Sequence, residues 1–196
     1  MIWDAAGNLY GTAQANGAYG QGVVFKLSPA GGGAWTETVL YAFQGEGDGC
    51  WPFDILFGPA GGIYGVAGCG GKGYQGIVFE LTESGGVWTR HTMHRFSETN
   101  GDAYGPNQLT MSAAGDLYTT GFWGGKYGYG AAVKLTPNLD GTWTESDLHA
   151  FTGGADGSNP TWGLIIGTDG NLYGTTPYGG NAFYQSGIGV VYSLKP

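Results

Sequence analysis

One short phrase occurs four times along the chain, and this internal repetition constrains the fold more than any other feature. In each copy a Gly-containing turn leads into Leu or Ile followed by Tyr, and the tyrosines are Tyr10, Tyr64, Tyr118 and Tyr173. Successive tyrosines are separated by 54, 54 and 55 residues. A second phrase keeps the same spacing, at 23–27, 77–81, 131–135 and 190–194. The chain therefore contains about four copies of one structural unit.

Within a unit, apolar and polar residues alternate with a period of two, which indicates β-strands. Phe79 and Leu81 share one face of a strand, for example, and Glu80 lies on the other. The second unit predicts four strands, at 55–57, 63–64, 77–81 and 88–96. Repeated units of four antiparallel strands are typical of the blades of a β-propeller. A stacked β-solenoid is the alternative, although its repeats are usually shorter.

The composition supports one all-β domain over residues 1–196. Gly accounts for 42 of the 196 residues without a Gly-X-Y period, and 15% of the residues are aromatic, which excludes collagen and a disordered linker. We expect repeats at about 1–50, 51–104, 105–158 and 159–196, with the last blade lacking its outer strand. Two arrangements remain open: a slightly open four-bladed ring from one chain, or a homodimer whose two chains form a ring of about eight blades.

The charge argues against nucleic acid and against an anionic membrane surface as partners. Seven basic residues against 15 acidic ones give a net charge of −8, whereas sequence-independent binding of nucleic acid needs Lys and Arg to neutralise phosphates. No apolar run approaches the roughly 18 residues that span a bilayer, so we expect no membrane span. Residues 1–7 also lack the basic start and apolar stretch of a signal peptide.

Several of the repeated phrases resemble the bacterial tandem-repeat proteins called GloVer repeat proteins. The matching segments are 170–176, Gly179-Gly180, 25–29 and 156–160. The resemblance covers essentially the whole chain and implies a repeated, propeller-like fold with an extracellular or cell-surface location, but no settled activity. The third unit departs from the pattern, with Phe122-Trp123 in its loop and Ala103 where Gly is usual. We expect that this unit has diverged for contact with a ligand or partner.

Three aspartates, Asp48, Asp102 and Asp156, lie 54 residues apart in the loops between units. Because Asp before Gly commonly closes a turn by accepting backbone N–H groups, a structural role is the favoured interpretation. If these carboxylates converge with Asn107 or Asp54, their hard oxygen ligands would suit calcium. Calcium is therefore the one cofactor that the sequence suggests.

Aromatic side chains gather in the Gly-rich loops on the same expected face. Exposed aromatic rings on such loops are good platforms for sugar rings or apolar chains. For Tyr74, packing between blades remains equally open, whereas Trp123 and Tyr127 lie in the least regular loop and favour ligand contact. The candidate ligand-binding residues are Tyr74, Tyr104, Trp123, Tyr127, Tyr129 and Tyr178, and the loop of the fourth unit adds Phe183 and Tyr184.

The remaining reactive residues give weaker signals. Cys50 and Cys69 are expected on one face, where a disulfide would fit an exported protein, and free thiols remain the alternative. The histidines all lie on expected outer strands, where we interpret His94 and His149 as packing residues, and Glu145 is interpreted as solvated. No Gly-x-Ser-x-Gly, His-Glu-x-x-His or P-loop motif is present.

Three functions follow, in order of preference. The first is a secreted or surface binding module that holds a carbohydrate, another small ligand or a protein partner on its Asp- and aromatic-rich loop face. The second is a calcium-dependent hydrolase of the lactonase or esterase type, by analogy with six-bladed propeller lactonases. The third is a fragment of a structural repeat array.

Overall fold

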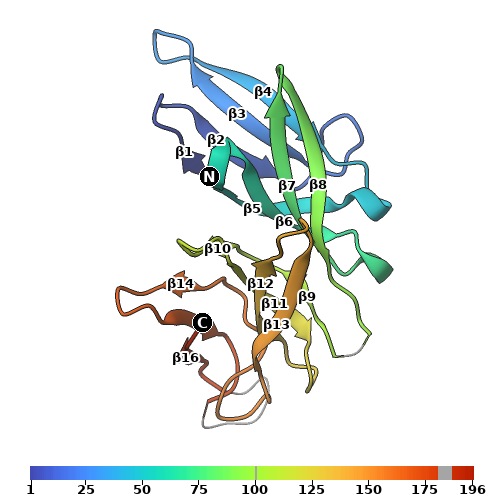
Figure 1. The fold of residues 1–196 in the computed structure, drawn as a ribbon, viewed down its shortest axis with the longest axis vertical. Helices are drawn as coiled ribbons and strands as arrows, with labels where there is room; N and C mark the ends of the chain where they lie inside the picture. The colour runs from blue at the N-terminus through green and yellow to red at the C-terminus, as the bar shows by residue number, and fades with distance from the viewer. Residues whose placement is uncertain (100, 181–186) are drawn as a thin grey trace.

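The computed structural model describes residues 1–99, 101–180 and 187–196. Within these residues the chain is all-β: four antiparallel sheets are joined by loops and three short 3-10 turns, with no α-helix. Figure 1 shows the two N-terminal sheets in the upper half of the molecule and the two C-terminal sheets in the lower half. The expected all-β class is confirmed, and no helix in the described ranges could span a membrane.

Each sheet corresponds to one sequence repeat. Sheet 1 contains β1 (Ile2–Trp3), β2 (Leu9–Ala13), β3 (Val23–Pro29) and β4 (Trp35–Ala42). Sheet 2 contains β5 (Cys50–Phe57), β6 (Ile63–Cys69), β7 (Ile77–Ser84) and β8 (Val87–Arg95). Sheet 3 contains β9 (Ala103–Pro106), β10 (Thr110–Met111), β11 (Leu117–Gly124), β12 (Ala131–Pro137) and β13 (Trp143–Ala150). Sheet 4 contains β14 (Ile165–Ile166), β15 (Leu172–Thr176) and β16 (Val190–Leu194), and the 3-10 turns are η1 (Glu46–Asp48), η2 (Pro59–Gly61) and η3 (Lys72–Tyr74).

Strands that follow one another in sequence pair with one another in space. Sheets 1 and 2 run in the orders β1-β2-β3-β4 and β5-β6-β7-β8. In sheet 3 the first strand is divided, because β9 and β10 pair separately with β11. Sheet 4 runs β14-β15-β16, so β16 forms an edge with no fourth strand beside it in the described part of the chain.

A β-bulge occurs at the same place in the outer hairpin of sheets 1, 2 and 3. The register shifts between Val24 and Phe25, between Val78 and Phe79, and between Ala132 and Val133. In sheet 2, Val78 pairs with His94 and Phe79 with Thr92, which leaves Met93 as the extra residue. Because a bulge re-aims the side chains around it, Met93 packs against the core while the next residue, His94, returns to the strand pairing opposite Val78.

The hydrophobic core lies between neighbouring sheets. Phe43 and Phe79 are fully buried and meet edge to face between sheets 1 and 2, with ring centroids 5.2 Å apart. Leu117 and Leu172 are fully buried in the two following clusters. Burying such a side chain contributes roughly 1.5–3 kcal/mol. Each sheet therefore packs against the next through apolar side chains. Polar groups lie mainly in the connecting loops.

Candidate functional site

A cavity of about 740 Å³ lies where the loops of sheets 1 and 2 meet. The β2–β3 loop contributes Gln21, the β4–β5 loop contributes Gln44 and Glu46, and η3 contributes Tyr74. The start of β5 contributes Trp51. The backbone N–H of Trp51 donates a hydrogen bond of 2.9 Å to the carbonyl oxygen of Gln21, and this bond joins the two sheets at the cavity.

Two aromatic side chains in this cavity are exposed and adopt an unusual backbone conformation. Trp51 is 52% exposed and has φ of 55°, and Tyr74 is 60% exposed and has φ of 64°. Glu46, another residue that lines the cavity, has φ of 46°. A positive φ is an outlier for a bulky residue, because its Cβ crowds the backbone. Three of the five non-glycine residues with positive φ in the described segments therefore line one cavity.

The other repeats use small, permissive residues where Trp51 stands. The hydrogen bond from Trp51 to Gln21 is matched by one from Gly105 to Gln75 and by one from Asn159 to Tyr129. Gly105 and Asn159 have φ of 68° and 53°, so the position is left-handed in three repeats. Gly and Asn are the residues that tolerate this conformation best.

Tyr74 is also a bulky residue at a position that two other repeats fill with Gly. It stands two residues before Gly76, just as Gly20 and Gly128 stand two residues before the equivalent Gly22 and Gly130. Gly20 and Gly128 have φ of 73° and 82°. The aromatic rings of Trp51 and Tyr74 thus occupy positions where the scaffold itself is best served by Gly or Asn.

A disulfide joins Cys50 to Cys69 at the wall of the cavity. The two residues lie directly opposite each other in the β5–β6 pair, with Cα atoms 5.0 Å apart. Of the two states that the sequence left open, the structure has the disulfide, and it joins the start of β5 to β6 next to Trp51.

In the described residues Asp48, Asp102 and Asp156 do not gather into one group of neighbouring carboxylates. Each closes its own loop: the Asp48 carboxylate accepts from the backbone N–H of Gln44, Asp102 from Ser97 and Asp156 from Thr152, at 2.8–3.0 Å. Burial raises the pKa of Asp156, but hydrogen bonds from Thr152 and His149 outweigh it, and the net shift is downward. The favoured structural interpretation therefore describes their geometry.

The other predicted aromatic residues lie in the third and fourth repeats, away from this cavity. Trp123 is on β11 and pairs with Tyr104 of β9, so it lies in a strand and not in the irregular loop that the sequence suggested. Its ring meets Phe122 at a centroid distance of 4.6 Å. Tyr127 is exposed beside Lys126, and Tyr129 and Tyr178 are half-buried. Phe183 and Tyr184 lie outside the described residues.

A second cavity, of about 370 Å³, lies beside the first strands of the sheets. It is lined by Asp54, Asn107 and Trp162, among others. Burial raises the pKa of Asp54, although its carboxylate accepts a hydrogen bond of 3.1 Å from the backbone N–H of Leu109. Asn107 donates a hydrogen bond of 3.0 Å to the carbonyl oxygen of Pro160. Both side chains thus help to join neighbouring repeats.

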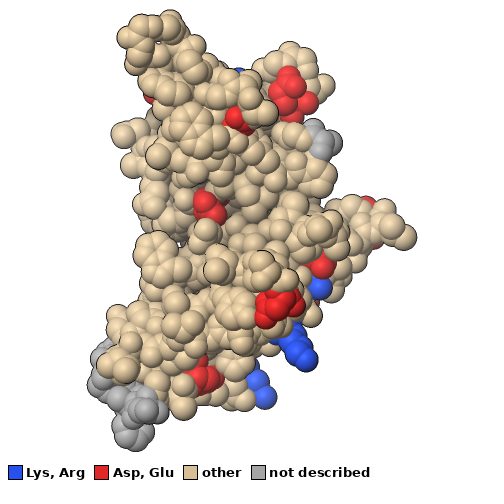
Figure 2. All heavy atoms as spheres, turned by 90° about the vertical axis from the view of Figure 1, so that its left-hand side faces the viewer, with Lys and Arg blue, Asp and Glu red and all other residues tan. Residues whose placement is uncertain are grey.

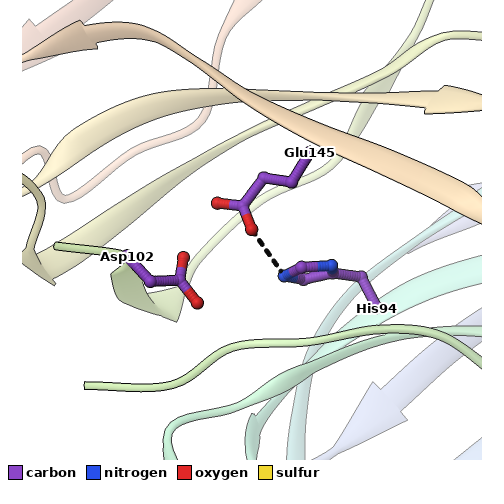
Figure 3. A group of neighbouring side chains, drawn as sticks. All are labelled: His94, Asp102 and Glu145. Carbon is purple, nitrogen blue, oxygen red and sulfur yellow. Dashed lines mark ion pairs between the residues drawn. The ribbon is translucent and has the colours of Figure 1, made fainter. Parts of the chain in front are cut away.

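A third group of polar side chains lies between sheets 2 and 3 (Figure 3). His94 comes from β8, Glu145 from β13 and Asp102 from the loop before β9. His94 Nε2 is 3.0 Å from Glu145 Oε2, and one ligand atom from each residue lies within 4.8 Å of the other two. In the described segments no other group of three or more His, Cys, Asp or Glu residues meets in this way.

Electrostatics in this group differ sharply between the two carboxyl groups. Burial and the adjacent Glu145 raise the pKa of Asp102 to about 7. Burial also acts on Glu145, but its interactions with His94 and Asp102 outweigh burial and lower its pKa. Two carboxyl groups this close cannot both ionise freely. The interpretation of Glu145 as a solvated residue was wrong, since only 21% of its side chain is exposed.

The repeat pattern and the four sheets decide the family. A model of the Gloeobacter/Verrucomicrobia repeat matches residues 1–196. The chain belongs to the Gloeobacter/Verrucomicrobia repeat family. The resemblance to the GloVer repeat proteins is thereby confirmed. No curated protein matches the sequence.

Solved structures of similar fold come from larger proteins. A presumed gluconolactonase has a TM-score of 0.55 at 15% identity, with 99% of this chain and 58% of that one covered. A gluconolactonase from Xanthomonas campestris has a TM-score of 0.53 at 14% identity, with 99% and 55% covered. A bifunctional GH43-CE protein from Bacteroides eggerthii has a TM-score of 0.50 at 14% identity, with 89% and 21% covered. The chain spans little more than half of the first two, and the likeness is one of fold.

Sequence reasoning missed Trp51, His94 and Glu145 as functional candidates. For Trp51 a signal was present, because the repeats align it with Gly105 and Asn159. For the pair of His94 and Glu145, the sequence places both on outer strands but does not show that neighbouring sheets bring them to 3.0 Å.

Proposed function

We propose that the chain is a binding module for neutral carbohydrate, and that the ligand is held in the cavity between sheets 1 and 2. The observation that carries the proposal is the pair of exposed aromatic residues, Trp51 and Tyr74, in left-handed backbone positions that the other repeats fill with Gly or Asn. Strained conformations of this kind cost roughly 1–3 kcal/mol each and cluster at functional sites.

The chemistry of the cavity fits a sugar. Aromatic rings offer flat apolar faces for the C–H side of a sugar ring, at a small cost in conformational entropy. The amides of Gln21 and Gln44 and the carboxylate of Glu46 offer hydrogen bonds to hydroxyl groups around the same cavity. A net charge of −8 disfavours an anionic ligand.

The disulfide supports an extracellular or cell-surface location as part of this proposal. Disulfides persist in oxidising compartments and are rare in reducing ones. A surface location would expose the cavity to polysaccharides or to the glycans of another cell.

The test is a titration with soluble neutral oligosaccharides of glucose, xylose and mannose, followed by tryptophan fluorescence and calorimetry. Trp51→Asn and Tyr74→Gly copy the residues of the other repeats and should fold normally. We expect the wild type to bind a member of the panel and each variant to lose at least about tenfold in affinity, which corresponds to roughly 1.4 kcal/mol.

Trp123→Ala is the matched control, because Trp123 is a similarly exposed tryptophan in the next repeat. Binding that survives in Trp51→Asn and is lost in Trp123→Ala would move the site to the third repeat, as the sequence alone suggested. Absence of binding across the whole panel would remove the carbohydrate proposal.

A second candidate is a lactone or ester hydrolase at the cavity beside the first strands. Asp54 supports it, because its half-buried carboxyl with a raised pKa suits a general base. Calcium stays part of this candidate: Asp54 is the one carboxylate among the described lining residues, and three side-chain amides, among them that of Asn107, offer further oxygen ligands of the kind that Ca²⁺ takes. Hydrolysis of simple lactones by the wild type and not by Asp54→Asn would establish this candidate, and a flat response would remove it.

We also propose that the four sheets are consecutive blades of a β-propeller, and that two chains complete one ring of about eight blades. The antiparallel order within each sheet and the stacking of successive sheets support the blades. In the described part of the chain β16 has no strand on its outer side, and pairing with a strand of a further chain would cover this edge. A structural repeat array remains the alternative if neither binding nor catalysis is found.

A further inference from the structure

Sheets 1 and 2 meet at a polar contact, and sheets 2 and 3 meet at the equivalent contact one repeat further on. The two contacts differ in the charges of their side chains. Between sheets 1 and 2, Asp48 Oδ1 accepts a hydrogen bond of 2.6 Å from the Tyr41 hydroxyl and forms an ion pair with Arg90 Nε at 2.8 Å. We call this contact closed, meaning that the guanidinium cation of Arg90 neutralises the carboxylate of Asp48.

The corresponding residues between sheets 2 and 3 are His94, Asp102 and Glu145. The register establishes the correspondence: Arg90 pairs with Leu81 as Glu145 pairs with Leu135, and Tyr41 pairs with Val24 as His94 pairs with Val78. An arginine has therefore been replaced by a glutamate and a tyrosine by a histidine. The site keeps its carboxylate but loses the cation that balanced it.

Two buried atoms in this second contact have no hydrogen-bond partner: His94 Nε2 and Asp102 Oδ1. Glu145 Oε2 lies 3.0 Å from His94 Nε2 but out of line for a hydrogen bond from the ring. Unpaired buried polar atoms are costly. Figure 3 shows the three side chains pointing toward one another from three separate elements.

We propose that His94, Asp102 and Glu145 bind a divalent transition-metal ion, with Zn²⁺ as the best fit. The ion would supply the positive charge that Arg90 supplies in the equivalent contact. One imidazole nitrogen and two carboxylates form a donor set that suits zinc, whereas calcium prefers oxygen ligands alone. This metal site is separate from the proposed carbohydrate cavity and does not depend on it.

The surroundings leave room for a fourth ligand. A cavity of about 340 Å³ is lined by two of the three proposed ligands, Asp102 and Glu145, and by Asp147 among others. Asp147 lies two residues beyond Glu145 on β13 and so projects from the same face of the strand. Three protein ligands with an open position allow a water molecule, Asp147 or an external ligand to complete the coordination.

The test uses protein stripped with EDTA and titrated by calorimetry with Zn²⁺ and, separately, with Ca²⁺. The decisive variant is the double substitution His94→Tyr with Glu145→Arg, which copies the closed contact and should therefore fold. Glu145→Gln is the single variant. His149→Ala is the matched control, because His149 pairs with Asp156 at 3.0 Å and no third potential ligand joins them among the residues that the structure describes.

We expect one Zn²⁺ per chain, bound more tightly than Ca²⁺, and a loss of affinity of at least about tenfold in both site variants. His149→Ala should bind Zn²⁺ as the wild type does. Co²⁺ should give visible absorption bands in the wild type that are absent in the double variant. No saturable binding of Zn²⁺, or equal binding by the wild type and the folded double variant, would overturn the proposal.

Discussion

At the scale of single residues, positions with a left-handed backbone distinguish two roles: Gly serves the backbone conformation there, whereas a bulky residue at such a position serves through its side chain. Most such positions in the described chain are filled by Gly, which adopts positive φ without steric cost. Trp51 and Tyr74 are bulky residues at positions of this kind, so the fold would be more stable without them. This conflict between stability and side-chain identity is expected at a functional site.

Tyr74→Gly should therefore stabilise the protein while it weakens ligand binding. Relief of the left-handed conformation is expected to raise the free energy of unfolding by about 1 kcal/mol, and little buried surface is lost because the ring is largely exposed. Urea denaturation of the wild type and the variant measures the difference.

Tyr127→Gly is the control for this substitution. Tyr127 is also an exposed tyrosine in the equivalent loop, but its φ is not positive. Glycine at an ordinary position costs roughly 0.5–1 kcal/mol, so this variant should be destabilised. Equal losses of stability in the two variants would show that Tyr74 is not strained.

Asp54 gives a prediction with a defined sign. Burial raises its pKa above the ordinary value of 3.8, so the folded state favours the protonated carboxyl. Its stabilising contribution is present below pH 3.8 and is lost as the pH rises through the raised pKa. The stability of Asp54→Asn minus that of the wild type should therefore increase as the pH rises above about 4.

Urea denaturation at several pH values measures this difference, and the subtraction cancels the titration of other groups. A difference that stays constant with pH, or one that falls, would contradict the assignment of a raised pKa to Asp54.

The sequence predicts single residues well where a repeat imposes their role. Asp48, Asp102 and Asp156 are turn-closing residues because each accepts a backbone N–H of its own loop, and local hydrogen bonding of this kind follows from spacing. The cluster of His94 with Glu145 could not be predicted in this way, because it depends on how two sheets pack against each other. Trp51 is predictable in part. The repeat aligns it with Gly105 and Asn159, but the positive φ at this position is seen only in the structure.

At the scale of elements, alternation of apolar and polar residues predicted the strands because each sheet buries its side chains against a neighbour. The strand at 77–81 corresponds to the start of β7, and the strand at 88–96 closely matches β8. The separate strand β9 was not predicted, since Ala103–Pro106 is short and contains Gly and Pro. Its pairing with the end of β11 also explains why Trp123 lies in a strand.

The cross-strand disulfide stabilises β5 and β6, and its removal tests how much. Cys50 and Cys69 are 19 residues apart, and closing a loop of about this length contributes roughly 3 kcal/mol in the chain-entropy model. The variant Cys50→Ser with Cys69→Ser should lose about that much stability in urea denaturation.

The same double variant should also bind ligand more weakly, because Trp51 directly follows Cys50. The wild type under reducing conditions is the control and should show a similar loss. Unchanged stability in both would mean that the strand pairing alone fixes this part of the fold.

At the scale of the whole molecule, the two end sheets each carry exposed apolar side chains. Trp3 in sheet 1 is 61% exposed and Val191 in sheet 4 is 78% exposed, although both lie on strands. Figure 1 places these sheets at opposite ends of the molecule. Figure 2, which turns the left-hand side of Figure 1 toward the viewer, shows separate Asp and Glu groups on a mostly uncharged face, with Lys and Arg only near its edge. Apolar side chains on terminal sheets of a stacked array are expected to be covered by a further sheet.

If sheet 4 of one chain packed against sheet 1 of a second chain and the reverse, the exposed apolar side chains of both end sheets would be buried. We therefore expect light scattering to give about twice the 20.3 kDa of a single chain. Val191→Lys should shift the mass toward one chain, because it places a charge on the proposed contact, whereas Val87→Lys on exposed β8 of sheet 2 should leave the mass unchanged. A wild-type mass near 20.3 kDa at all concentrations would exclude the two-chain ring and leave a single open array of four sheets.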